Sequence, residues 1–172
     1  MFSILSVTLS AQQYTDYELK AAYIFNFSKF VSWPQNAFDK DDGDFNIVVF
    51  GDSPITKVLF NAFKGRKIQN RDISIKVIYR IEDLPETHIL FVSREMQVEV
   101  VNLIESINDK PILVVGDVVE SFCQLGGTIN FTSRSSKYQF EINNNSAIRA
   151  HLRISSKLLA LSKIITINEI KF

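Results

Sequence analysis

Four polar residues directly follow stretches that are predicted to be buried strands, and their types could support ligand binding. Asp52 and Ser53 follow one stretch, Arg94 ends a second and Asp117 ends a third. In open α/β sheets, ligands bind in the crevice beyond the carboxyl ends of the parallel strands. An arginine beside a helix N-terminus would attract an anion there. The alternative is structural, with Asp52, Ser53 and Ser93 capping helices and Arg94 pairing with an acidic neighbour.

Catalytic patterns are scarce in this chain. Asp52 and Asp117 could form an acid–base pair, but nothing in the sequence fixes their separation. His88 and His151 have no partner at a metal-ligand spacing, so we interpret both as structural histidines. The chain contains no Walker loop, no GxGxxG fingerprint and no GxSxG elbow. We therefore predict no enzyme activity, no catalytic residue, no metal site and no cofactor.

A second set of candidates is basic. Arg149, Arg153 and Lys157 recur at intervals of four, which would align them on one stripe of a helix predicted over residues 145–165. Such a stripe is either a solvated helix face or a docking surface for an acidic partner.

Charge and cysteine content exclude several classes of protein. Lysine plus arginine equals aspartate plus glutamate at 19 each, so the formal net charge is zero and nucleic acid is not a predicted partner. Cys123 is the single cysteine, which rules out an intramolecular disulfide and favours a buried structural thiol.

The length of 172 residues fits one compact domain. Residues 1–11, MFSILSVTLSA, resemble the end of a secretory signal peptide, because a short apolar run leads to small residues before Gln12. This run is too short to span a membrane. We therefore expect a signal-peptide remnant over residues 1–11 and a single domain over residues 12–172.

Strand and helix patterns alternate through the domain. Apolar, β-branched runs predict strands, and 3.6-residue periodicity predicts helices. The predicted strands cover 45–51, 73–79, 88–94 and 111–117, followed by a hairpin of 128–134 with 137–143. The predicted helices cover 54–65, 95–107, 118–124 and 145–165, after a first helix that includes residues 21–33. We predict a single-domain α/β three-layer sandwich, with a largely parallel sheet, an antiparallel C-terminal hairpin and helices on both faces.

The first helix is unusually aromatic. A core helix, a membrane anchor and an exposed docking surface are all compatible with such composition, but a helix-covered sheet needs apolar helices. We therefore predict core packing. The expected inner stripe is Leu19, Tyr23, Phe27 and Phe30, widened by Ile24 and Val31, and the expected solvent-facing residues are Lys20, Ser28 and Lys29.

Three segments together resemble the YfiR family of exported bacterial proteins. LKAAYIFNFSKFVSWP (19–34) is similar to the family's aromatic opening helix ending in Trp-Pro. FCQLGGTINF (122–131) followed by YQFEIN (138–143) is similar to its glycine-pair segment and Phe-x-Ile-Asn strand. LRISSKLLALSKII (152–165) resembles its closing helix. The order and coverage of these segments make the resemblance fairly specific.

The resemblance implies a periplasmic, non-enzymatic and commonly dimeric regulator. Such proteins repress a membrane-bound diguanylate cyclase by binding its periplasmic domain, which lowers cyclic di-GMP and restrains biofilm formation. A sensor kinase is an alternative partner. The chain departs from the pattern in lacking cysteine pairs, so redox control by an internal disulfide cannot operate. From the residues alone, a nucleotide or amino-acid sensor that uses Asp52, Ser53, Arg94 and Asp117 remains the alternative function.

Overall fold

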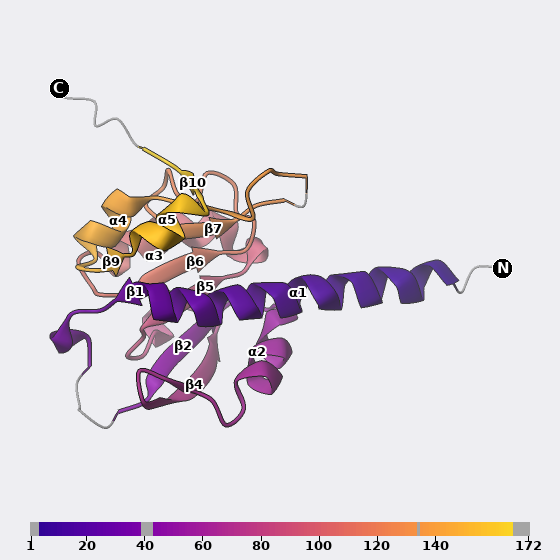
Figure 1. The fold of residues 1–172 in the computed structure, drawn as a ribbon, viewed down its shortest axis with the longest axis horizontal. Helices are drawn as coiled ribbons and strands as arrows, with labels where there is room; N and C mark the ends of the chain where they lie inside the picture. The colour runs from indigo at the N-terminus through magenta and orange to yellow at the C-terminus, as the bar shows by residue number, and fades with distance from the viewer. Residues whose placement is uncertain (1–3, 39–42, 134, 167–172) are drawn as a thin grey trace.

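A mostly parallel sheet forms the middle layer of the protein (Figure 1). The computed structural model describes the backbone of residues 4–38, 43–133 and 135–166, and side chains from residue 15 onward within these ranges. The eight strands lie in the order β10-β8-β7-β6-β5-β2-β4-β3. The parallel central strands are β2 (Phe45–Phe50), β4 (Arg71–Ile78), β5 (Ile89–Val92), β6 (Leu113–Gly116) and β7 (Ile129–Phe131).

The outer strands add antiparallel pairs. β8 (Phe140–Ile142) forms the predicted hairpin with β7, and β3 (Lys67–Ile68) pairs antiparallel with β4. β10 (Lys163–Ile164) then extends the sheet parallel to β8, so the hairpin is not its edge. A separate two-stranded sheet joins β1 (Val31–Ser32) to β9 (Arg153–Ile154). The predicted fold class is confirmed.

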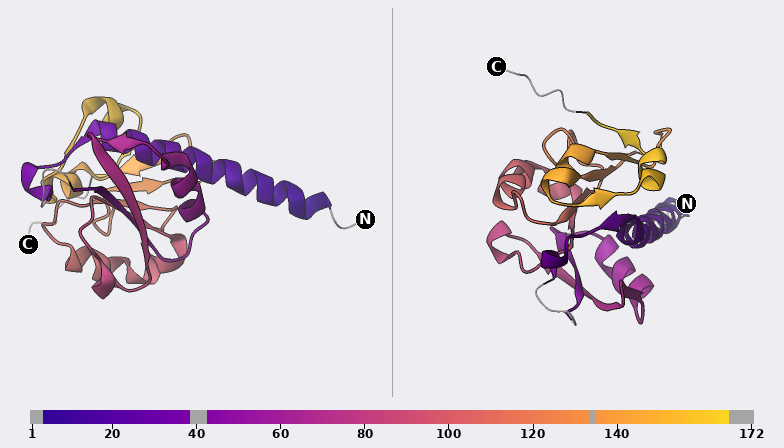
Figure 2. Two further views of the ribbon diagram at one scale, coloured as in Figure 1. Left: turned by 90° about the horizontal axis from the view of Figure 1, so that it is seen from below. Right: turned by 60° about the vertical axis from the view of Figure 1, so that its left-hand side comes forward.

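Helices cover both faces of the sheet (Figures 1 and 2). On one face lie α1 (Ile4–Phe30), α2 (Ile55–Phe63), α4 (Asn144–Arg149) and α5 (Ser156–Ala160). On the other lie the 3₁₀ segment η3 (Arg94–Glu99) and α3 (Val100–Ser106). Two short 3₁₀ turns, η1 (Gln35–Ala37) and η2 (Ile81–Asp83), lie in connections. Among the described residues, no helix is both long and apolar enough to cross a bilayer.

Alternation along the strands explains the two cores. In β2, Ile47 and Val49 belong to the core beneath α1 and α2, while Val48 and Phe50 belong to the core beneath α3. All four side chains are fully buried. Because both faces of β2 are covered, the sequence from Ile47 to Phe50 is continuously apolar rather than alternating.

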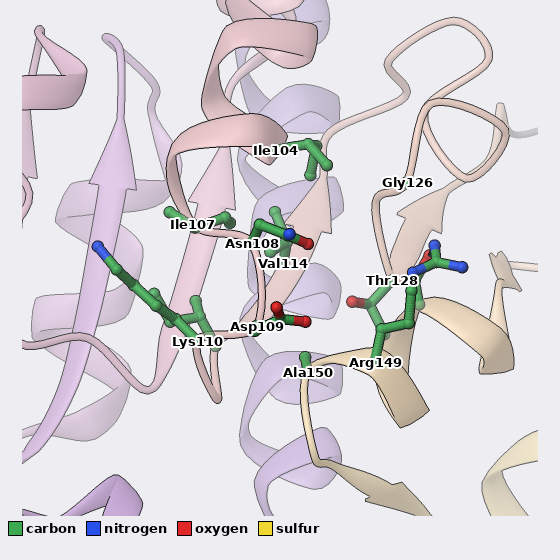
Figure 3. A pocket seen from close by; sticks show the side chains of 12 residues that line it. Ile104, Ile107, Asn108, Asp109, Lys110, Val114, Gly126, Thr128, Arg149 and Ala150 are labelled. Atoms are coloured by element: carbon green, nitrogen blue, oxygen red, sulfur yellow. Dashed lines mark hydrogen bonds between the residues drawn. The ribbon is translucent and has the colours of Figure 1, made fainter.

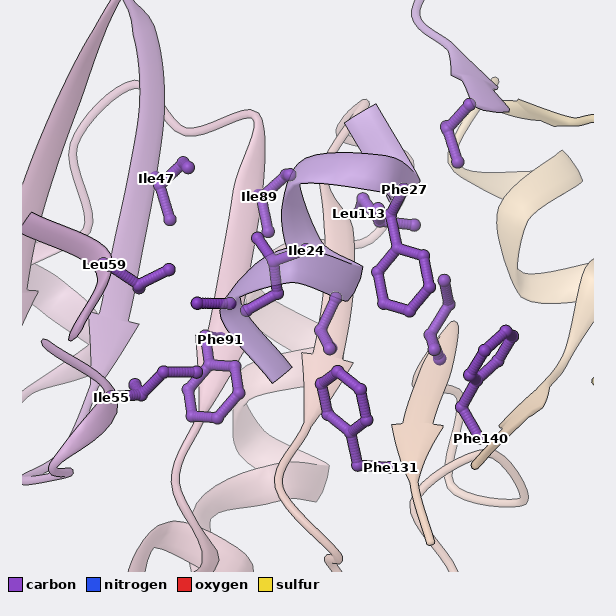
Figure 4. Packing of buried hydrophobic residues seen from close by; sticks show 14 of the residues in the cluster. Ile24, Phe27, Ile47, Ile55, Leu59, Ile89, Phe91, Leu113, Phe131 and Phe140 are labelled. Carbon is purple, nitrogen blue, oxygen red and sulfur yellow. The ribbon is translucent and has the colours of Figure 1, made fainter. Parts of the chain in front are cut away.

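The aromatic segment of α1 packs in the interior, as predicted (Figure 4). Phe27 is completely buried, and its ring lies 5.1 Å from Phe140 and 5.9 Å from Phe131 between ring centroids. Tyr23 and Phe30 are partly buried and pack against the same cluster. α1 is therefore anchored to the sheet by ring–ring contacts with β7 and β8.

The predicted faces of α1 are confirmed for most positions: the inner residues Tyr23, Ile24, Phe27, Phe30 and Val31 are buried or partly buried, and Lys29 is exposed. Three residues differ from the prediction. Leu19, expected inside, is 48% exposed, whereas Lys20 and Ser28, expected outside, are buried. Both buried polar groups have a partner. The Lys20 ammonium donates to the Asp117 carboxylate, and the Ser28 hydroxyl donates to the Phe25 carbonyl at 2.6 Å. With those partners available, the helix turns Ala21, rather than Leu19, toward the sheet.

A buried histidine fixes the connection between α1 and β2. The His88 Nδ1 atom accepts from the Asn46 backbone N–H at 2.9 Å, so its Nε2 atom carries the proton and donates to the Ala37 carbonyl at 3.0 Å. The ring stacks against both Phe38 and Phe45, at centroid distances of 4.5 and 4.9 Å. These contacts confirm the structural role predicted for His88.

The predicted long final helix is wrong. Residues 145–165 instead form α4, β9, α5 and β10 in succession. His151 takes a positive φ of 57°, which ends helical geometry. The Ser155 hydroxyl then accepts from the Leu158 N–H and begins a new short helix. His151 is therefore an exposed turn residue rather than a helical one.

The helix predicted over 118–124 is replaced by turns. Val118 and Ser121 have φ values of 55° and 53°, which a right-handed helix cannot contain. Gly127 closes the segment where a Cβ atom would lie 2.3 Å from the Phe122 ring, so only glycine fits there. In the predicted 95–107 helix, the first turns are 3₁₀ and α-helix begins at Val100.

We expect Phe27→Ala to lower the free energy of unfolding by about 3–5 kcal/mol, because the removed ring leaves a cavity between α1 and the sheet. Phe60→Ala on α2 is the matched control, since Phe60 is 53% exposed; its effect should stay within about 0.5 kcal/mol. Urea unfolding of both variants measures the difference, and equal losses would contradict core packing of α1.

Candidate functional site

The carboxyl ends of the central strands meet the first helix at an ion-pair cluster. Asp117 follows β6 and is 5% exposed. Its carboxylate accepts from the Lys20 ammonium at 2.6 Å and from the Tyr17 hydroxyl at 3.1 Å. Asp16, one turn before Lys20, lies 3.0 Å from the same ammonium. Side chains of α1 therefore occupy the crevice beyond the carboxyl end of β6, where a ligand was predicted to bind.

Proton affinities in this cluster follow from burial and charge. Burial alone would lower the pKa of the Lys20 ammonium, but the charge and hydrogen bond of Asp117, with help from Asp16, raise it above its ordinary value. Burial raises the pKa of the Tyr17 phenol, and the negative charge of Asp117 adds to that effect. Lys20 is therefore a cation and Tyr17 a neutral donor at physiological pH.

The structure brings together two of the four predicted ligand residues. Ser53 is buried, and its hydroxyl accepts from the Ile55 N–H at 3.3 Å and interacts with the Tyr17 phenol. Ser53 and Asp117 are thus linked through Tyr17. The Ile55 contact is a local turn just before α2, whose N-cap residue is Pro54, so Ser53 lies one residue before the cap position predicted for it.

Asp52 and Arg94 are not part of this cluster. Both side chains are exposed, and the Asp52 backbone N–H donates to the Glu95 carboxylate. Arg94 is the first residue of η3, where the Ser93 hydroxyl donates to the Phe50 carbonyl instead of capping the turn. A ligand that touched all four residues would have to extend from a buried acidic group to an exposed arginine.

Sequence reasoning missed Lys20 and Tyr17. The signal was present locally, since Asp16 and Lys20 are four residues apart on a helix, the spacing of an intrahelical ion pair. The decisive partner, Asp117, lies 97 residues away from Lys20 and could not be paired with it from spacing.

The three basic candidates do not form a helical stripe. Arg149 ends α4, Arg153 belongs to β9 and Lys157 lies in α5. All three are exposed, so each is accessible to a partner. Because the helical geometry ends at His151, they do not share one helix face. Arg149 is held by a 3.0 Å hydrogen bond from its guanidinium to the Ser146 hydroxyl.

Arg149 lines a small hollow beside the start of β6 (Figure 3). Thr128 and Arg149 lie on one side of it, and Asn108 and Asp109 on the other. Its volume is about 50 Å³, which admits a few water molecules but not a nucleotide or amino acid.

Cys123 is buried in the turn before β7, as predicted. Its thiol contacts the Thr128 and Glu141 carbonyls at 3.8 and 3.7 Å. Burial raises the thiol pKa far above its ordinary value, so the reactive thiolate does not form at physiological pH. Asn143 braces the same turn by donating to the Cys123 carbonyl at 2.7 Å and caps α4 through Ser146. Within the described side chains, no group of three or more His, Cys, Asp or Glu residues could hold a metal ion.

We expect the buried ion pair to make stability fall at alkaline pH. The pKa values of Lys20 and Tyr17 are both raised by folding. Their stabilising effect is therefore complete below the unfolded values, about 10, and is lost as pH rises through the folded values. The free energy of unfolding, measured with urea between pH 8 and 11, should decline above about pH 10.

Lys20→Met tests the origin of that decline. At pH 7 it should cost about 3 kcal/mol, because Asp117 is left buried without its cation, and its alkaline decline should be shallower than that of the unsubstituted protein. Lys57→Met, which removes an exposed lysine on α2, is the control and should leave the slope unchanged. The same slope in Lys20→Met as in the unsubstituted protein would contradict this role.

Comparison with known proteins agrees with the motifs at both ends of the domain. The family model described as YfiR/HmsC-like matches residues 17–163. No curated protein matches the chain. The match begins at Tyr17, whose hydroxyl contacts Asp117, and ends at Lys163, the first residue of β10, so it contains all the strands from β1 to β9. The chain belongs to the YfiR/HmsC-like family.

Proposed function

We propose that the protein is an exported, non-enzymatic regulator that binds the periplasmic domain of a membrane-bound diguanylate cyclase and lowers cyclic di-GMP. The observation that carries this proposal is the YfiR/HmsC-like match over residues 17–163. The polar cluster supports it, because the buried Lys20 and Asp117 satisfy each other rather than pointing an unpaired group into a reaction site. A homodimer is proposed as the working form, and a sensor kinase is the alternative partner.

Export is proposed to remove residues 1–11. Residues 1–3 lie outside the described part of the chain, and residues 4–14 are described only as backbone. Figure 1 shows the N-terminal part of α1 extending beyond the sheet. The described members of the cluster on α1 are Asp16, Tyr17 and Lys20, so cleavage before Gln12 would leave the Lys20–Asp117 cluster complete.

Repression requires a difference in affinity between two states of the cyclase. A regulator that bound active and inactive states equally would change neither population. Shifting the cyclase from 1% to 99% inactive takes roughly 10⁴-fold tighter binding to the inactive state, or about 5.5 kcal/mol. Contacts of that size require a surface rather than a single residue.

Deleting the gene should raise intracellular cyclic di-GMP, and reintroducing the chain from Gln12 onward behind a cleavable export leader should restore the lower level. The same chain without a leader is the matched control and should fail to restore it, because the partner domain is periplasmic. Mass spectrometry of nucleotide extracts measures the outcome. Unchanged cyclic di-GMP in the deletion strain across several growth conditions would contradict the proposal.

A small-molecule sensor is the second candidate function, and Asp117 favours it. Its carboxylate already binds one ammonium, that of Lys20, beside the hydroxyl of Tyr17. An amino acid could present the same group to the crevice, with its carboxylate toward the exposed Arg94. Such a ligand would have to displace Lys20, and α1 would respond.

For this alternative, thermal-shift measurements with amino acids and nucleotides give the test. A ligand at 100 times its Kd should raise Tm by about 5 °C or more. Arg94→Ala should weaken that ligand's binding, whereas Arg80→Ala, which removes an exposed arginine paired with Glu82, should not. Full affinity in Arg94→Ala would eliminate this site.

A further inference from the structure

A second hollow lies at the opposite edge of the sheet from β10, between the C-terminal end of α1 and the edge strand β3. Its apolar lining is Phe25, Val31 and Ile68, and its charged lining is Lys29 and Lys67. The volume is about 400 Å³, within the range of binding pockets and well above the 50 Å³ beside Arg149. We call it the α1–β3 hollow.

Two cations, Lys29 and Lys67, line this hollow, and two more from other parts of the chain lie beside its lining residues. The Lys29 ammonium lies 4.5 Å and the Arg66 guanidinium 5.0 Å from the centroid of the Phe25 ring. Lys67 contributes a third charge from β3. Arg153 pairs with Ser32 in the β1–β9 ladder, and directly opposite residues of such a pair project to the same face. Since Ser32 lines the hollow, Arg153 projects to the same side as the lining.

One of these four cations has an acidic partner among the described residues, and three do not. Lys67 lies 3.1 Å from Asp72, and both side chains are largely exposed. Across the described residues, no carboxylate lies within ion-pair distance of Lys29, Arg66 or Arg153. The whole chain has no net charge, so the excess is local. The helix dipole explains the position of one of these cations, because Lys29 lies in the last turn of α1, where a positive charge is stabilised. The dipole does not explain the positions of Arg66 and Arg153.

We propose that the α1–β3 hollow binds an acidic segment of the protein partner, a deepening that rests on the proposed function. Carboxylates of the segment would pair with Lys29, Arg66 and Lys67. An apolar side chain of the segment would cover the partly buried Phe25, while Val31 and Ile68, which are already buried, line the hollow from within the fold. A lone inorganic anion would leave Phe25 uncovered, and a basic or neutral segment would leave Lys29 and Arg66 without an acidic partner.

The chemistry of this site sets how binding depends on salt. Exposed ion pairs contribute little affinity each but raise the association rate and select the partner. Because the Debye length shrinks from about 10 Å at 0.1 M to about 3 Å at 1 M ionic strength, binding through the hollow weakens with salt. A mainly apolar interface would not respond in this way.

The first experiment measures binding of the partner's periplasmic domain by calorimetry. Lys29→Gln/Arg66→Gln should weaken binding about 10-fold or more and flatten its salt dependence. Lys110→Gln is the matched control, because Lys110 is an exposed cation lining the other hollow, and should leave affinity unchanged. If the double substitution leaves partner binding unaffected, the hollow is not the binding site, but the proposed function stands. If the unsubstituted protein does not bind the partner at all, the proposed function is overturned.

The second experiment uses a defined probe on the full chain. A ten-residue peptide alternating Glu and Leu should shift the backbone amide NMR signals of residues 25–32 and 66–69, and a Lys–Leu peptide should not. Equal shifts with glutarate at the same carboxylate concentration would mean a small-anion site and overturn the proposal. If the double substitution converts a dimer of the protein to a monomer, the hollow binds a second copy of the chain, and that result would also overturn the proposal.

Discussion

The ion pair between Lys20 and Asp117 links the first helix of the chain to the carboxyl end of a central strand, 97 residues away. A buried ion pair adds little net stability relative to well-packed apolar residues, because desolvation offsets the attraction. What it supplies is position. An aromatic helix can rotate or slide over an apolar sheet at small cost, but Lys20 meets Asp117 in one orientation only. The ring contacts of Phe27 with Phe131 and Phe140 follow from that orientation.

Much of the fold was predictable because the informative patterns are local. A strand buried on both faces is nearly continuous in apolar residues, as β2, β5 and β6 are; Asn46 in β2 is the exception among β2 and β5 residues. The errors arise where local patterns are ambiguous. Residues 145–165 carry apolar residues at helical spacing, yet the segment needs a positive φ at His151 and a new cap at Ser155. Tertiary packing on β1 and β8 decides that break, and no periodicity records it.

The candidate site was predictable only in part, for a related reason. Strand ends identified Ser53 and Asp117, since topology alone brings those positions to one edge. The groups that occupy the crevice come from α1, and pairing Lys20 with Asp117 requires knowing how that helix lies. Helical spacing even suggested the opposite, placing Lys20 in water. When a lysine lies within an apolar helical face, a buried carboxylate partner is therefore the better prediction than exposure to solvent.

Internal satisfaction of polar groups also bears on how a regulator of this family can act. Where Lys20, Asp117, His88 and Cys123 are all buried and partnered within the chain, little free energy is available from them for binding. Recognition then depends on groups that folding leaves unpaired. Lys29, Arg66 and Arg153 beside the α1–β3 hollow have no carboxylate within ion-pair distance among the described residues, and Lys29 lies on the same helix that Lys20 positions. Movement of α1 would therefore change the strand-end crevice and the hollow together, which is the physical requirement for coupling a ligand at one to a partner at the other.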